Sequence, residues 1–183
     1  MDYVHVQTVF EIVSYLLSYP DRQWREQLDD CATFSQQIPH RPIVQNIQKF
    51  IDYVKQTDET PCIETYVYTF DFGKKTNLYV TYMSTGEQRE RGIELLQLKQ
   101  LYKSAGFDIT ERELPDYLPL MLEFASQAER VYVQPLMQKY FNHISHIREQ
   151  LIAAESYYAI LFDVLLMALE EIGVCKLAEG SVS

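Results

Sequence analysis

Apolar residues recur at three- and four-residue steps along most of the chain, which is the spacing of one face of an α-helix. One such stripe begins near the N-terminus, a second covers residues 23–37 and a third follows Pro42. Pro20 and Pro39 separate them, because the residue before a proline is pushed out of helical geometry. The positions expected to face inward are Val6, Val9, Phe10, Val13, Leu16, Leu17, Trp24, Leu28, Cys31 or Ala32, Phe34, Ile43, Ile47, Phe50, Ile51 and Val54.

Residues 63–83 fit two different structures. Aromatic residues alternate with others from Tyr66 to Phe72, and a turn-like GKKTN stretch then precedes LYVTY, which is typical of a β-hairpin. The same residues also show helical spacing, with Thr60 as N-cap and Pro61 in the first turn. An isolated hairpin is marginally stable in water, and the chain offers no other strand to pair with it. We therefore predict two short helices here.

Three further stretches show the helical spacing. Residues 87–104 carry an apolar face and are followed by Gly106, a typical helix stop. Residues 136–151 predict another helix, and residues 156–172 are apolar nearly all round, which predicts a central one. The apolar face of the first stretch comprises Ile93, Leu96, Leu98 or Lys99, Leu101 and Tyr102. The pattern as a whole predicts an all-α, single-domain bundle of roughly seven to nine helices over residues 1–183, with the last few residues disordered.

Composition agrees with this prediction and removes two classes of partner. The chain has 183 residues, of which 47% are hydrophobic, so it can bury enough surface to fold without a disulfide or a metal. Its 6 glycines are few, which disfavours turn-rich β folds and glycine-rich phosphate-binding folds. The net charge of −10 argues against nucleic acid and against anionic membrane surfaces as partners.

Cysteine usage and the N-terminal sequence indicate a cytoplasmic protein. Cys31, Cys62 and Cys175 are far apart and odd in number, so they predict neither a disulfide framework nor a zinc knuckle. The N-terminal stretch lacks the basic region of a secretory signal. The longest apolar run, residues 157–169, is interrupted by Asp163 and is shorter than the roughly 20 residues that a membrane-spanning helix needs. We expect no stable membrane insertion.

Residues able to perform catalysis or bind metal are scattered. His143 and His146 lie three residues apart, but Ile144 and Ile147 define the buried face of their helix and no second histidine or cysteine pair joins them. Solvated or core-edge histidines are therefore favoured over a metal site. Cys62 has no obvious base nearby, and the sequence contains no metalloprotease, P-loop, nucleophile-elbow or dinucleotide motif. We expect no enzymatic activity, no metal and no cofactor.

Residues 111–123 combine acids with an apolar Leu-Pro-Asp-Tyr-Leu-Pro core. Two interpretations remain open. One is a dry groove with carboxylates at its rim, suited to a peptide with apolar anchors and basic flanks. The other is a helix start with ordinary solvated charges, in which Thr110 and Glu113 form a capping box and the next helix begins at or after Pro115. The acids concerned are Glu113, Asp116 and Glu123.

Arg89 and Arg91 form a second charged cluster, beside several acids of the same predicted helix. They can pair with those acids at the surface, each pair contributing a few tenths of a kcal/mol. They can equally form an ion-pair network that fixes this helix against the acidic segment, or contact an anion. The neighbouring acids are Glu87, Glu90 and Glu94.

Several short motifs occur together in the central part of the chain. They are Tyr66-Val67, Thr69-Phe70-Asp71, Leu78-Tyr79-Val80-Thr81-Tyr82, Gly86, Arg89, Arg91-Gly92, Leu95-Leu96, Leu98-Lys99, Tyr102, Ala105-Gly106, residues 113–119 and Leu122-Glu123-Phe124. In combination they resemble the nitrate reductase molybdenum cofactor assembly chaperones, the NarJ-type or delta-subunit family. More distantly, the chain is similar to the wider TorD-like group of redox-enzyme maturation chaperones.

The resemblance implies an all-helical, TorD-like and non-catalytic chaperone. Such proteins bind the immature catalytic α subunit of respiratory nitrate reductase, in part through its N-terminal peptide. They keep it competent for insertion of the molybdenum cofactor and delay its attachment to the membrane. The family's Pro-Asp motif falls on Pro115-Asp116, and Tyr117 stands where the TorD-like group often has histidine, which fits the nitrate reductase branch. Glu87 follows Gly86 where the family commonly has aspartate.

Residue pattern and resemblance together predict a groove for an amphipathic client segment. The predicted client-binding residues are Tyr66, Phe70, Tyr79, Tyr82, Glu113, Pro115, Asp116, Tyr117, Leu118, Leu122 and Glu123, with Arg89 and Arg91 in a structural or ion-pair network. The carboxylates would meet basic residues of the client and favour the right partner. Two alternatives are a TorD-like chaperone for another molybdoenzyme and a small helical enzyme. The second is disfavoured by the missing nucleotide loop and the missing Asp-rich metal motif.

Overall fold

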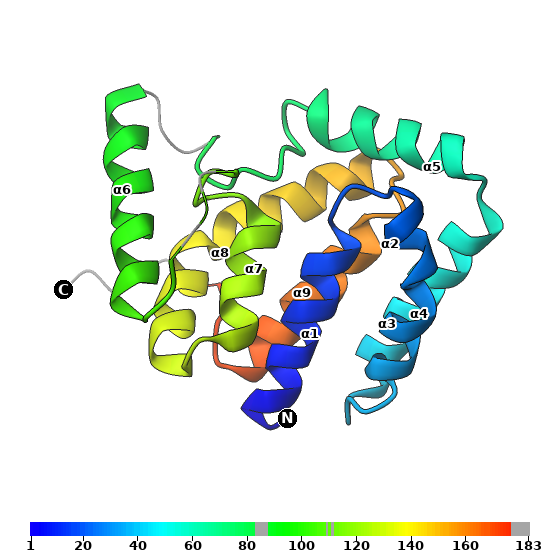
Figure 1. The fold of residues 1–183 in the computed structure, drawn as a ribbon, viewed down its shortest axis with the longest axis horizontal. Helices are drawn as coiled ribbons and strands as arrows, with labels where there is room; N and C mark the ends of the chain where they lie inside the picture. The colour runs from blue at the N-terminus through cyan, green and yellow to red at the C-terminus, as the bar shows by residue number, and fades with distance from the viewer. Residues whose placement is uncertain (83–87, 109, 111, 177–183) are drawn as a thin grey trace.

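Helices form all the regular secondary structure in the part of the chain that the computed structural model describes, residues 1–82, 88–108, 110 and 112–176. The all-α prediction is confirmed, and Figure 1 shows how the helices are arranged. Within the same residues, no helix is both long and apolar enough to cross a membrane. In chain order the elements are α1 (Tyr3–Leu16), α2 (Arg22–Glu26), α3 (Leu28–Ser35), α4 (Arg41–Gln56), α5 (Glu59–Tyr66), the π-helix η1 (Val67–Asp71), α6 (Gln88–Ser104), α7 (Leu118–Gln127), α8 (Arg130–Ala153) and α9 (Ala159–Glu171). The last residues of the chain, predicted to be disordered, lie outside the described part.

The N-terminal helices largely follow the predicted apolar stripes, but the second predicted helix is divided. The Asp21 carboxylate caps α2 by accepting a hydrogen bond from the Trp24 backbone N–H, at 2.8 Å. The helix is interrupted at Gln27 (φ −96°, ψ 2°), but the buried positions Trp24, Leu28, Cys31 and Ser35 keep three- and four-residue spacing across the interruption. Phe34, predicted to be buried, is 55% exposed.

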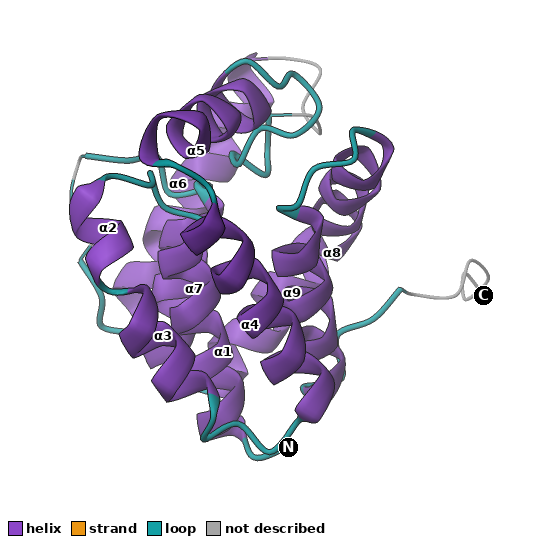
Figure 2. Cartoon of the chain, turned by 90° about the vertical axis from the view of Figure 1, so that its right-hand side faces the viewer, coloured by secondary structure: helices purple, strands orange, loops and turns teal. Residues whose placement is uncertain are grey.

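The core is built around α9, as predicted from its apolar sequence. α1, α4 and α8 all pack against α9, and α7 packs against α1 (Figures 1 and 2). Burial is nevertheless incomplete on one side of α9. Ile160, Asp163 and Met167 are only half-buried and Glu170 is exposed, and these positions share one face at three- and four-residue steps. The predicted central position of α9 is confirmed, and the stripe that stays uncovered contains its acids Asp163 and Glu170.

α6 lies at one edge of the molecule and packs through part of its predicted face (Figure 1). Leu98 and Tyr102 are buried, and the Tyr102 ring lies 4.6 Å from that of Phe124 between centroids. Ile93 and Leu96 are 52% and 56% exposed, so the expected inward position of these two is wrong. The helix ends as predicted, with Gly106 at a positive φ of 88°.

Residues 63–82 are helical only in their first half. α5 begins after Asp58, two residues before the predicted N-cap at Thr60, and continues directly into η1. The stretch from Phe72 to Tyr82 contains neither the second predicted helix nor a hairpin. Its backbone is held by side chains instead: the Thr76 hydroxyl donates to the Thr69 carbonyl, and the side-chain oxygen of Asn77 accepts from the backbone N–H of Tyr79.

The three cysteines are expected to differ in reactivity in the folded protein. Cys31 and Cys62 are buried and Cys175 is exposed. Burial, with Asp30 nearby as a weaker cause, raises the pKa of the Cys31 thiol to about 11. Iodoacetamide near pH 8 should therefore alkylate Cys175 first, with Cys31 reacting at least about 100-fold more slowly because thiolate is the reactive form. Mass spectrometry of timed samples measures both rates, and equal rates would contradict the burial of Cys31.

Candidate functional site

The segment that follows η1 lies against the segment that precedes α7. The backbone N–H of Val80 donates to the Asp116 carbonyl at 3.0 Å, and that of Leu118 donates to the Leu78 carbonyl at 2.8 Å. Tyr79 and Tyr117 thus form an isolated antiparallel bridge. The LYVTY stretch therefore pairs through its backbone with the Pro-Asp-Tyr motif, which is distant in the sequence, and not with a strand of a local hairpin.

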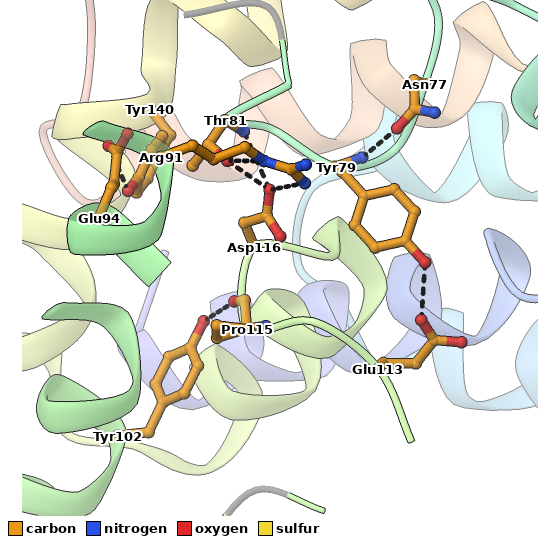
Figure 3. Close-up of polar contacts among 10 residues, drawn as sticks. All are labelled: Asn77, Tyr79, Thr81, Arg91, Glu94, Tyr102, Glu113, Pro115, Asp116 and Tyr140. Atoms are coloured by element: carbon orange, nitrogen blue, oxygen red, sulfur yellow. Dashed lines mark hydrogen bonds and ion pairs between the residues drawn. The ribbon is translucent and has the colours of Figure 1, made fainter. Parts of the chain in front are cut away.

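Asp116 is the most deeply placed charge of this region, with a fully buried residue surface. Its Oδ2 accepts from the Thr81 hydroxyl at 2.6 Å and from the Thr81 backbone N–H at 3.3 Å. The same oxygen forms an ion pair with Arg91 of α6 at 3.4 Å (Figure 3). The expectation that Asp116 lies at an exposed rim is wrong, because these contacts hold its carboxylate inside and join three segments of the chain.

Arg91 is held by more than its ion pair. Its Nε donates to the Thr81 hydroxyl at 3.2 Å, and its guanidinium lies 5.7 Å from the centroid of the Tyr82 ring. The structure therefore places α6 against the acidic segment through Arg91. Arg89 is exposed and forms no ion pair with any residue that the structure describes. Glu87 of this cluster and Gly86 of the family motif lie outside the described residues.

Three tyrosines lie together at the bridge, two joined by a hydrogen bond and the third by ring packing. The Tyr66 hydroxyl donates to the Leu17 carbonyl at 3.1 Å, so the Tyr117 hydroxyl, 3.3 Å away, must donate to Tyr66. The Tyr79 ring packs on that of Tyr117, and its hydroxyl donates to Glu113 Oε2 at 2.8 Å. Burial is the main cause that raises the pKa of all three phenols above the ordinary value of 10, so they remain neutral donors at physiological pH.

The predicted client-binding residues divide by burial. Tyr82, Glu113 and Glu123 are exposed, and Tyr79 and Tyr117 are half-buried. The remaining apolar members belong to the hydrophobic core and do not line an open groove in this structure; they are Tyr66, Phe70, Pro115, Leu118 and Leu122. These residues pack in the core of this structure, and their predicted contact with a client stays a prediction.

The exposed acids do not share one hollow. Glu123 lines a hollow of about 220 Å³ with Phe107 and Gln127. Glu113 does not line this hollow and instead accepts a hydrogen bond from the Tyr79 hydroxyl. The capping box predicted from Thr110 and Glu113 does not form, because α7 begins only at Leu118. This start agrees with the prediction that the helix begins at or after Pro115.

Several contacts of this region were not predicted from the sequence. No contact was predicted for Thr81, although its hydroxyl and its backbone N–H both donate to the Asp116 carboxylate. The Tyr102 hydroxyl donates to the Pro115 carbonyl at 2.7 Å (Figure 3). Tyr140 of α8 donates to Glu94 of α6 at 2.8 Å, and Lys139 forms an ion pair with the same carboxylate at 3.1 Å. The signal that could have suggested the first contact is one acid within the apolar Leu-Pro-Asp-Tyr-Leu-Pro motif and one hydroxyl within the apolar Leu-Tyr-Val-Thr-Tyr motif, because polar groups of buried motifs need partners.

The histidine pair of α8 shows no metal-site geometry. No group of three or more His, Cys, Asp or Glu side chains suited to a metal ion occurs among the residues that the structure describes. Burial is the main cause that lowers the pKa of His143. His143 therefore favours the neutral form, consistent with a histidine at the edge of the core.

The comparison with protein families agrees with the motifs of this region. Residues 39–159 match the family model described as "Nitrate reductase delta subunit". The chain belongs to the nitrate reductase delta subunit family. Over 176 residues it is 50% identical to the "Probable nitrate reductase molybdenum cofactor assembly chaperone NarJ" of Bacillus subtilis (strain 168), covering 96% of each chain.

Other relatives place the same family unit in longer proteins. The NarJ chaperone of Escherichia coli (strain K12) is 31% identical over 158 residues, which cover 85% of this chain and 66% of that one. The "Nitrate reductase-like protein NarX" of Mycobacterium tuberculosis (strain ATCC 25618 / H37Rv) is 29% identical over 153 residues, covering 82% of this chain and 22% of that protein. Delta-subunit sequence thus occurs both as most of a chaperone and as a minor part of a larger chain.

Proposed function

We propose that this delta-subunit family member is a chaperone for the immature catalytic α subunit of respiratory nitrate reductase. It binds the subunit, including its N-terminal peptide, and keeps it competent for molybdenum cofactor insertion and membrane assembly. The observation that carries this proposal is the 50% identity, over 96% of both chains, to a relative named as such an assembly chaperone. The proposed role is binding and not catalysis, and its proposed place is the cytoplasm.

Part of the predicted site remains available to a client. Tyr79, Tyr82 and Tyr117 present aromatic surface, and Glu113 and Glu123 present exposed carboxylates. Aromatic side chains are effective anchors in protein interfaces, and exposed acids accelerate encounter with basic partners. Beneath them, the buried members of the predicted set support this surface, and the pair of Asp116 with Arg91 fixes it to α6.

A tagged chain recovered from nitrate-respiring cells tests the proposal. We expect the α subunit to co-purify in a form that lacks molybdenum, and we expect cells without this chain to load less molybdenum into the α subunit. Metal analysis of the α subunit from both strains measures the effect. Co-purification of another molybdoenzyme subunit in its place would favour the TorD-like alternative, and normal molybdenum loading without this chain would contradict the proposal.

A further inference from the structure

The outer side of α6 carries exposed aliphatic surface beside an apolar hollow. α6 lies at one edge of the molecule (Figure 1), and Ile93 is 52% exposed there. A hollow of about 240 Å³ lies between α6 and α8 and is lined mainly by aliphatic side chains, among them Leu101 and Pro135. Val131 of α8, which also lines it, is 68% exposed. Exposed aliphatic residues gathered beside an apolar hollow mark an interaction surface.

The exposed isoleucine and the hollow are placed symmetrically along α6. Ile93, Gln97 and Leu101 follow one another at four-residue steps and therefore share one face of the helix. The hollow is lined by Gln97 and Leu101 and not by Ile93. Ile93 and Leu101 are thus equally far from Gln97, each about 6 Å along the helix axis and in opposite directions.

This spacing makes the surface complementary to itself. A two-fold axis that passes Gln97 at right angles to α6 sets the α6 helices of two copies antiparallel. Ile93 of each copy then meets the hollow beside Leu101 of the other copy. A two-fold contact requires such a patch, because both copies present the same residues. The hollow is large enough, since a cavity of about 150 Å³ already admits a benzene-sized group.

Charge favours the same arrangement. Glu90 and Lys103 are exposed, and neither forms an ion pair with any residue in the described part of the chain. Within one copy they are thirteen positions apart, about 20 Å along the helix, which is too far for them to pair. With the axis at Gln97, position 90 of one copy lies beside positions 103 and 104 of the other. Each Glu90 then meets a Lys103 of the other copy, and the pair occurs twice.

We propose that the chain forms a homodimer through α6, with the two α6 helices antiparallel about a two-fold axis at Gln97. The interface consists of one helix from each copy and the adjoining part of α8, so it belongs to the small size class. Interfaces of this class are typical of reversible contacts, and we expect a dissociation constant in the micromolar range. This proposal does not rest on the proposed function and uses none of the predicted client-binding residues.

Sedimentation equilibrium of the purified full chain, from about 1 to about 200 μM, measures the dimer. Ile93→Glu places a carboxylate against the apolar hollow of the other copy and should weaken dimerisation at least about tenfold. The matched control is Ile152→Glu, the same change at a 48% exposed isoleucine of α8. Ile152 is thirteen residues beyond Lys139, the last residue that lines the hollow, so this variant should dimerise within about twofold of the wild type.

A charge exchange tests the pairing of Glu90 with Lys103. Glu90→Lys and Lys103→Glu each bring like charges together across the interface and should each weaken dimerisation about threefold or more at low salt. The double variant restores both pairs with reversed polarity and should return to within about twofold of the wild type. Both side chains are exposed, so the three variants are expected to fold normally.

Cysteine cross-linking locates the axis. In a Cys175→Ser background, which removes the exposed native thiol, Gln97→Cys should form a disulfide-linked dimer under mild oxidation with diamide. Ser104→Cys is the matched control on the same helix, because its two copies would lie about 21 Å apart along the axis and should not cross-link. A wild-type chain that stays monomeric up to about 200 μM overturns the proposal. It is equally overturned by a dimer that Ile93→Glu leaves unchanged, or by cross-linking no faster at position 97 than at position 104.

Discussion

Replacing Asp116 with alanine is expected to lower the free energy of unfolding by about 3 kcal/mol. The substitution removes the acceptor for both donors of Thr81 and the ionic partner of Arg91. Asp116 is fully buried, whereas the Arg91 side chain is 27% exposed and can regain some water, so the lower end of the range for a broken buried pair applies.

Urea unfolding of the wild type and the variant measures this loss. Glu123→Ala is the matched control, because it removes an exposed carboxylate from the neighbouring helix and should change stability by less than about 0.5 kcal/mol. An Asp116→Ala protein as stable as the wild type would show that the carboxylate is not a structural link. Weaker client binding by this variant can be assigned to lost contact only after its stability is known.

Leu122→Ala is the second substitution with a large expected effect, a loss of about 3 kcal/mol. Leu122 lies in α7 with no exposed surface, so truncation leaves a cavity as well as removing apolar contacts. This expectation is the opposite of what a groove-lining role would give, since a surface leucine contributes little to the stability of the free protein.

The control for Leu122 is Leu114→Ala, a leucine that is 42% exposed in the segment before the same helix. We expect it to cost less than about 1 kcal/mol. Chemical unfolding of both variants without client provides the comparison. Equal and small losses for the two leucines would show that α7 packs less tightly than the structure describes.

The helices were predictable because the spacing of apolar residues within each helix identifies the face that packs. The stripes of α1 and α4 name their buried residues correctly, since each helix has one wide apolar face and clear breaks at its ends. Phe34 was misplaced because three- and four-residue steps from Cys31 reach both Phe34 and Ser35, and the structure buries the smaller, polar Ser35. Apolar periodicity favours the phenylalanine at such a choice and cannot identify a buried serine.

The candidate site was less predictable because its contacts join distant residues. Asp116 meets Thr81, which is 35 positions earlier in the chain, and Arg91, which is 25 positions earlier. A pattern that names an acid and an arginine cannot say that they meet, nor that the acid becomes buried in doing so. The apolar residues of the same motif were predicted to bind a client. Whether they face a client or the core depends on how the segment after η1 lies against the segment before α7.

The backbone bridge between Leu78 and Leu118 also closes a long loop of the chain. Its two ends are 40 residues apart, so all of α6 is contained in a loop that must close before the bridge forms. The entropy cost of closing such a loop grows slowly, by about 0.6 kcal/mol for each doubling of its length. Loop-closure entropy alone would therefore change little if the connections that flank α6 were longer, provided that the contacts of Arg91, Leu98 and Tyr102 are kept.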